Sequence, residues 1–247
     1  VDLSNITNYI SHKTYIIVLA VLAIPLAIAM FSLASLAAYQ GIIKFKNLGN
    51  LKILVAIPVA EVIVCIVLLL GPLIYDINSY PELQSNFDYT DLTFYTGEMF
   101  NLLEFLVIMI YLISSLQYRN HKAITIFLLI TGILLMLFSL YHRTEKIVAT
   151  NNYAIASVFI IISLLPYFFS KLHSPEQEKF QTDPTFLVTS GFFVQFSLTL
   201  PSSILIQRLG ISEVHICNMI LLVNYSAYTF YFYTLLKGFQ CQIELTK

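Results

Sequence analysis

Two acidic residues, Glu61 and Glu104, lie inside long apolar stretches of this chain. Taking a carboxylate out of water penalises its charged form, so an ionisable residue within a bilayer indicates a functional site. Glu61 lies about nine residues, or about 14 Å, into one stretch, and Glu104 lies about ten residues into the next stretch from its opposite end. Adjacent antiparallel helices would therefore bring both carboxyls to a similar depth.

Further polar residues recur at helical spacing in the apolar stretches. Asn101 and Glu104 are three residues apart and share a helix face, as do Gln195 and Thr199. Together these patterns predict a midplane ligand- or ion-binding centre formed by Glu61, Asn101, Glu104, Gln195, Asn224 and Tyr228. The alternative is that the amides only hold helices together, at about 0.6 kcal/mol for each hydrogen bond.

The composition is that of a membrane protein. Of the 247 residues, 58% are hydrophobic and 11% are charged, whereas soluble domains carry about 25% charged residues. The net charge is −1 and no cluster of Lys and Arg is present, which excludes nucleic acid as a partner. The chain has no Trp, so tyrosines are expected to supply the aromatic belt at the headgroups.

Several kinds of chemistry lack their sequence signals. The three cysteines are scattered and the five histidines make no HxxxH pair, so neither a disulfide framework nor a metal site is expected. No phosphate loop, nucleophile elbow or GxGD-type aspartyl motif is present, so the hypothesis of an intramembrane enzyme rests only on the pair Glu61 and Glu104. A covalent retinal cofactor would need a lysine in the middle of the last helix, but the first lysine there is Lys237. We therefore expect no cofactor.

Seven stretches are long enough to span a bilayer, which takes about 20 apolar residues. The sequence therefore predicts an all-α bundle of seven transmembrane helices in a single domain, 1–247. The predicted spans are 14–38, 51–75, 94–117, 123–141, 150–170, 184–207 and 212–236.

The Lys and Arg residues favour one orientation. Nine lie after the first, third and fifth spans and in the C-terminal tail, and four lie on the opposite side. The sequence predicts an outer N-terminus and a cytoplasmic C-terminus in a multi-pass protein of the inner membrane. The connection 76–93 is acidic, and it is either a solvated outer loop or a lid over an outward-facing cavity.

Local signals predict three structural features. Asp183 followed by Pro184 is typical of a helix start, with Asp at the N-cap. Gly191 is expected to permit close helix approach. Pro58, three residues before Glu61, is expected to kink the second helix.

Three features of the sequence resemble one family of membrane proteins: F-N-L-L-E-F-L-V-I-M-I-Y-L in the third span, D-P-T-F-L-V-T-S-G-F-F from Asp183 to Phe193, and Asn224. They are similar to those of a family of small seven-helix membrane proteins common in Bacteroidota. Family members have Trp where this chain has Leu187. The resemblance implies a lineage and no activity, and it marks five positions for testing: Glu61, Glu104, Asp183, Gly191 and Asn224.

Three functions remain open from the sequence. The leading hypothesis is a sensory, receptor-like bundle that binds a small or lipophilic ligand at the predicted midplane binding centre. It would act through a membrane or cytoplasmic signalling partner. The second is a proton- or cation-coupled transporter or channel that uses Glu61 and Glu104. The third is a non-catalytic membrane scaffold subunit. The lipid bilayer is a partner in every case, and homo-oligomerisation is left open.

Overall fold

The structure, a computed structural model, describes residues 3–77, 89–115, 119–141, 150–172, 182–209 and 214–246. These residues form helices and one 3-10 segment, and they contain no β-strand. In chain order the elements are α1 (Leu3–Ile43), η1 (Phe45–Val55), α2 (Ala56–Ile77), α3 (Tyr89–Ser115), α4 (Arg119–Tyr141), α5 (Thr150–Leu172), α6 (Pro184–Leu209) and α7 (Val214–Leu245).

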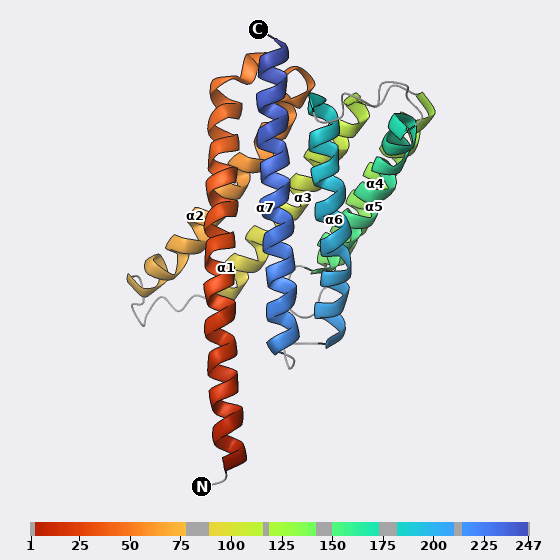
Figure 1. The fold of residues 1–247 in the computed structure, drawn as a ribbon. Coiled ribbons are helices and arrows are strands. Elements are labelled where there is room, and N and C mark those ends of the chain that lie inside the picture. The colour runs from red at the N-terminus through yellow and green to blue at the C-terminus, as the bar shows by residue number, and fades with distance from the viewer. Residues whose placement is uncertain are drawn as a thin grey trace.

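The helices form an up-and-down bundle with the two chain ends at opposite poles (Figure 1). Helix α7 packs against α6 on one side and α1 on the other. Helix α5 packs against α6, α4 and α3, while α2 packs against α1 and α3. Short connections between apolar helices favour this antiparallel order, and α4 lies at the periphery with most of its large apolar side chains exposed.

Seven helices in the described part of the chain are long and apolar enough to cross a membrane. Many large apolar side chains are exposed along them, including Ile28 on α1 and Phe127 on α4. Such a surface suits contact with lipid tails and not with water. The predicted all-α fold of seven membrane-crossing helices is confirmed at this level, and this is an integral, multi-pass membrane protein.

The second predicted span, 51–75, begins inside a 3-10 segment and not at the start of an α-helix. Residues 45–55 form η1, which is interrupted at Gly49 (φ 54°, ψ −124°), and the α-helix begins only at Ala56. Leu48, Leu51 and Leu54 are buried at a spacing of three, which matches the three residues per turn of a 3-10 helix. Their burial against the neighbouring helices favours η1 over a continuous α-helix.

This correction changes the surroundings of Glu61. Pro58 is the third residue of α2 and lies in its first turn, where its missing N–H breaks no helical hydrogen bond, so the predicted kink is wrong. Glu61 lies five residues after Ala56, about 8 Å along the helix instead of about 14 Å. The carboxyl is nevertheless buried.

The last helix is longer than predicted. Residues 237–245, expected to be a tail, continue α7 to Leu245. Phe239 is buried, and a Cβ added at Gly238 would overlap Val188 of α6, so this end of α7 packs tightly against α6. Apolar burial therefore extends the helix beyond the predicted span. The acidic connection falls largely outside the described residues, because 78–88 are not among them.

Tyrosine has two roles instead of the one expected. Tyr39 and Tyr141, each near the end of a helix, are exposed, as a headgroup belt requires. Tyr111, Tyr153 and Tyr231 are buried in the bundle. The absence of Trp therefore does not confine tyrosine to the membrane interface.

Candidate functional site

The two carboxyls identified from the sequence lie close together inside the bundle. Glu61 on α2 and Glu104 on α3 are both buried and interact electrostatically with each other. The Cys65 thiol, one turn along α2, donates a weak hydrogen bond of 3.6 Å to Glu61 Oε1. Glu104 Oε1 is buried without a hydrogen-bond partner. One carboxylate oxygen is thus left for a proton, a cation or a ligand to satisfy.

Tyr153 of α5 is the hub of the hydrogen bonds beside these carboxyls. Its hydroxyl accepts hydrogen bonds from Gln195 Nε2 at 3.0 Å and from the Tyr228 hydroxyl at 3.2 Å, and it lies 3.2 Å from Thr199 Oγ1. Thr199 also lies 2.7 Å from the Gln195 carbonyl oxygen. A threonine hydroxyl has only one proton. When Thr199 donates that proton to the Gln195 carbonyl oxygen, the Tyr153 hydroxyl can donate its own proton to Thr199 Oγ1. Three helices are therefore joined at one oxygen.

Two further tyrosines connect the hub to the acids. The Tyr228 and Tyr231 hydroxyls on α7 both interact electrostatically with Glu104 and with Glu61. Tyr231 Oη is buried without a hydrogen-bond partner of ordinary geometry, as is Gln195 Oε1. We use the name polar centre for the set Glu61, Glu104, Tyr153, Gln195, Thr199, Tyr228 and Tyr231.

Aromatic packing fixes these side chains. Tyr153 stacks on Phe196 with ring centroids 5.8 Å apart, and Tyr231 packs on Phe192 at 5.4 Å. Tyr228 stacks on Phe232 at 6.4 Å. The polar atoms are therefore held by rings that are themselves buried. A site held in this way is preorganised, because little side-chain freedom remains to be lost when a ligand binds.

Close approach of α6 and α7 is required for this arrangement. A Cβ added at Gly191 would overlap Thr234 Oγ1, so only glycine fits where α6 crosses α7. Gly191 lies one turn before Gln195, and Thr234 lies three residues after Tyr231. The glycine identified from the sequence thus lies where the two helices that supply most of the polar centre touch.

The charges of the polar centre have one sign. Its members are two carboxyls, four hydroxyl groups and one amide, with no Lys, Arg or His among them. Amide and phenol groups donate as well as accept hydrogen bonds, but only the carboxyls carry charge. The arrangement can therefore bind protons or a small cation, and it would repel an anion.

Two predicted members lie near the polar centre without a described bond to it. Asn101 is buried one turn before Glu104 on α3 and has a polar partner. Asn224 lies one turn before Tyr228 on α7, with Oδ1 buried and without a hydrogen-bond partner. A separate pair, Glu98 and Asn152, is joined by a buried hydrogen bond from Asn152 Nδ2 to Glu98 Oε2.

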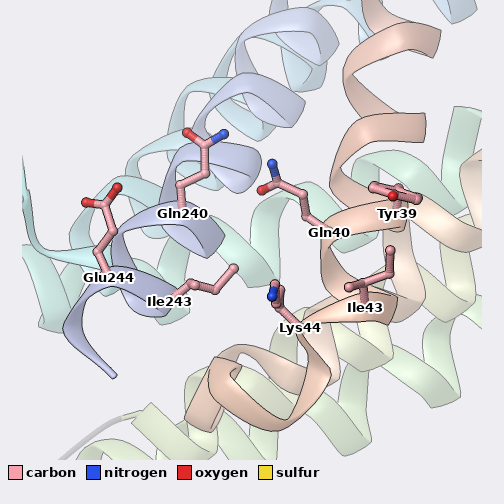
Figure 2. A pocket seen from close by; sticks show the side chains of 7 residues that line it. All are labelled: Tyr39, Gln40, Ile43, Lys44, Gln240, Ile243 and Glu244. Carbon is pink, nitrogen blue, oxygen red and sulfur yellow. The ribbon is translucent and has the colours of Figure 1, made fainter. Parts of the chain in front are cut away.

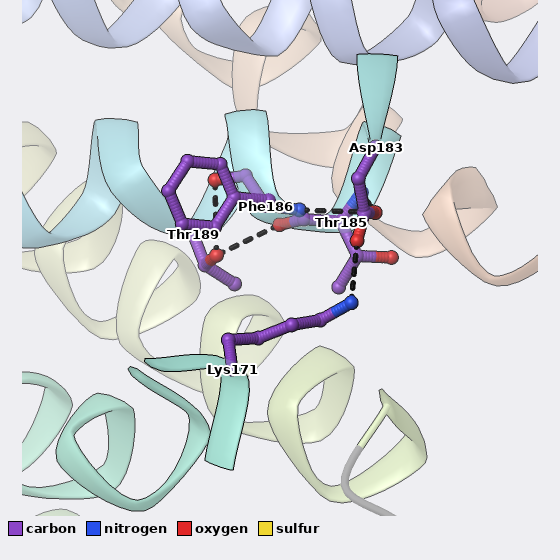
Figure 3. Close-up of polar contacts among 5 residues, drawn as sticks. All are labelled: Lys171, Asp183, Thr185, Phe186 and Thr189. Carbon is purple, nitrogen blue, oxygen red and sulfur yellow. Dashed lines mark hydrogen bonds and ion pairs between the residues drawn. The ribbon is translucent and has the colours of Figure 1, made fainter. Parts of the chain in front are cut away.

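The start of α6 forms a second polar cluster (Figure 3). Asp183 Oδ1 accepts hydrogen bonds from the backbone N–H of Thr185 at 2.9 Å and of Phe186 at 3.3 Å, which makes Asp183 the N-cap before Pro184. Asp183 Oδ2 is paired with Lys171 Nζ at 2.7 Å. This ion pair ties the end of α5 to the start of α6.

Tyr153 is the functional candidate that the sequence analysis missed. It lies three residues into its helix, where a tyrosine resembles an interfacial anchor. A signal was present, because Tyr153, Ile160, Leu164 and Tyr167 recur at i, i+7, i+11 and i+14 and are all buried. That pattern assigns Tyr153 to the interior face of α5.

No protein-family model, curated protein or solved structure matches this chain. Among the residues that the structure describes, no group of three or more His, Cys, Asp or Glu side chains could hold a metal ion. The polar centre is therefore the candidate functional site.

Proposed function

We propose that this integral membrane protein binds a small cation, a proton included, at the polar centre and passes the bound state to a separate membrane or cytoplasmic partner. The observation that carries the proposal is the interaction of buried Glu61 with buried Glu104, in a polar centre whose seven members include no Lys, Arg or His. Two buried carboxyls are destabilised when both are charged, because burial removes their solvation and the like charges repel each other. A bound proton or cation relieves that cost.

Helix α7 is the element through which binding would act. It supplies Tyr228 and Tyr231 to the polar centre, and it crosses α6 at Thr234. Its C-terminal end lies beside η1, where the Thr246 hydroxyl donates to the Asn47 carbonyl oxygen at 3.5 Å. A small shift of α7 on binding would therefore reach the end of the bundle where the C-terminus lies.

The test is a ligand-dependent shift in the thermal stability of the full chain in lipid nanodiscs. A ligand that binds only the folded protein raises the unfolding temperature, and the increase grows with the logarithm of ligand concentration over Kd. The probes are sodium, potassium, methylammonium and acidification. We expect at least one probe to stabilise the wild type and both Glu61→Gln and Glu104→Gln to remove that effect. The control Asp183→Asn changes a carboxyl outside the polar centre and should retain the shift.

Coupled transport is a second candidate, and one observation favours it. Glu98, Asn101, Glu104 and Tyr111 are all buried along α3, so polar side chains continue from the polar centre toward both ends of the helix. Proteoliposomes carrying a proton or sodium gradient distinguish the two functions. A transporter would dissipate the gradient in a manner that depends on both acids, whereas a sensor would leave it intact.

The lineage and topology expected from the sequence are part of the proposal. The Glu104–Phe105 and Asp183–Pro184 motifs support kinship with the seven-helix proteins of Bacteroidota. The distribution of Lys and Arg supports a cytoplasmic C-terminus in the inner membrane. The proposed mechanism needs no covalent retinal, because cation binding at the carboxyls requires no chromophore.

A further inference from the structure

A pocket of about 340 Å³ lies between the C-terminal ends of α1 and α7, apart from the polar centre. Figure 2 shows the α1 side chains on one side of it and the α7 side chains on the other. The lining combines opposite charges with amides and apolar groups: Tyr39, Gln40, Ile43, Lys44, Gln240, Ile243 and Glu244.

Two charged side chains and one buried amide oxygen of this pocket have no partner within the described part of the chain. Neither Lys44 nor Glu244 forms an ion pair among the described residues, although both line the same cavity. Gln40 Oε1 is buried without a hydrogen-bond donor. The pocket thus offers one cation for an anionic oxygen, and one anion and one amide oxygen for a donor such as an ammonium group.

The position of the pocket points to a lipid. Lys44 directly follows the candidate span Leu22–Ile43, and Glu244 is the last residue but one of the span Met219–Leu245. Both charges therefore lie where the apolar region ends, at the depth of phospholipid headgroups. Leu36 on α1 is 50% exposed and lies one turn before Tyr39, and Tyr233 on α7 is 47% exposed and lies three turns before Glu244. Both lie toward the middle of these spans and would contact acyl chains.

We propose that this pocket binds the zwitterionic phosphoethanolamine group of a phospholipid, with Lys44 on the phosphate and Glu244 and Gln40 on the ammonium. A headgroup without the ammonium, such as phosphoglycerol, leaves Glu244 unpaired beside an anion. A choline headgroup cannot donate hydrogen bonds to Gln40 or Glu244. The pocket therefore prefers phosphatidylethanolamine to both other lipids.

The shape of the pocket depends on the turn after α1. Lys44 N–H donates to the Gln40 carbonyl oxygen at 2.9 Å, and the chain then reverses through η1. Gly49 has a positive φ and lies beside Gln242 of α7, so the turn rests against the helix that carries Glu244. Lys44 is thus held at the pocket by backbone geometry and not only by its own flexible side chain.

The experiment is native mass spectrometry of the full chain, released from micelles that contain phosphatidylethanolamine or phosphatidylglycerol with the same acyl chains. We expect the wild type to retain phosphatidylethanolamine about fivefold more tightly, the effect of one exposed ion pair. Lys44→Gln and Glu244→Gln should each lower that retention about fivefold. The control Lys122→Gln removes a lysine of α4, a helix that does not line the pocket, and should leave retention unchanged.

Two results would overturn the proposal: equal retention of the two lipids by the wild type, or unchanged retention by both pocket variants. The first comparison uses only wild-type protein, so it decides the matter even if a variant fails to fold. Soluble phosphoethanolamine is added as a competitor to identify the source. Displacement of the lipid at comparable concentration assigns the pocket to the free zwitterion, and failure to displace it assigns the pocket to the membrane lipid.

Discussion

The Tyr228 hydroxyl of α7 donates a hydrogen bond of 3.2 Å to the Tyr153 hydroxyl of α5, across 75 residues of sequence. Gln195 of α6 donates to the same oxygen, and Thr199 Oγ1 of α6 lies within hydrogen-bond distance of it. Tyr153 therefore connects three helices at the point where two buried acids lie nearby. The first prediction tests whether this oxygen holds the bundle together.

Tyr153→Phe removes the hydroxyl that is hydrogen-bonded to Gln195, Thr199 and Tyr228. Interhelical hydrogen bonds in membranes contribute about 0.6 kcal/mol each, so we expect a loss of about 2 kcal/mol of unfolding free energy. Unfolding in a denaturing detergent measures this loss. Tyr228→Phe removes only one of the three bonds and is the matched control, and equal losses for the two variants would contradict the role of Tyr153 as hub.

Gly191→Ala forces a methyl group into Thr234 of α7. Overpacking of this kind costs about 1–3 kcal/mol, and we expect a loss of stability in that range. Thr234→Ala removes the overlapping oxygen but leaves Thr234 Cβ 3.1 Å from the added carbon, so relief in the double variant is partial. A double-mutant cycle measures this coupling, and additive losses would show that Gly191 does not act through Thr234.

Asp183 combines a helix cap with an ion pair, and two substitutions separate them. Asp183→Asn retains a side-chain acceptor for the Thr185 and Phe186 N–H groups but removes the charge facing Lys171. Because this pair is partly exposed, we expect a loss of less than about 1 kcal/mol. Asp183→Ala also removes the cap and should cost about 1 kcal/mol more. Equal unfolding free energies for the two variants would contradict the capping role.

The orientation of the bundle follows from its basic residues. The end at which α1 and α7 finish carries Lys44, Lys46, Lys52 and Lys237, which predicts that this end faces the cytoplasm. A fluorescent protein fused after Thr246 should fold and fluoresce, whereas alkaline phosphatase at the same place should be inactive. The reverse pattern would place the C-terminus outside and contradict the predicted topology.

The helices could be predicted because bilayer thickness imposes a length of apolar sequence that any spanning helix must satisfy. Asp183–Pro184 and Gly191 were recognisable for a local reason, since a cap and a close approach each depend on one residue type. The start of α2 was not, because the apolar residues Ile53, Leu54 and Val55 of η1 lead without a break into Ala56. The spacing of three between Leu48, Leu51 and Leu54 is the sequence pattern that fits a 3-10 helix.

The candidate site was predictable only in part. Glu61, Glu104 and Gln195 attract attention because such side chains are costly in a bilayer. Tyr153 does not, because tyrosine is tolerated at both the interface and the interior, and its partners lie 42 and 75 residues away. The pairing of Lys171 with Asp183 is likewise a tertiary contact that depends on how α5 and α6 pack.

An experimental density map of the wild-type protein in a lipid nanodisc, inspected around Glu61 and Glu104, tests whether the polar centre binds a cation. We expect ordered density for a cation, a ligand or water between the two carboxyls, in contact with Glu104 Oε1. A dry interior, with each carboxyl hydrogen-bonded to a neighbouring helix, would contradict this expectation and assign both acids to helix packing.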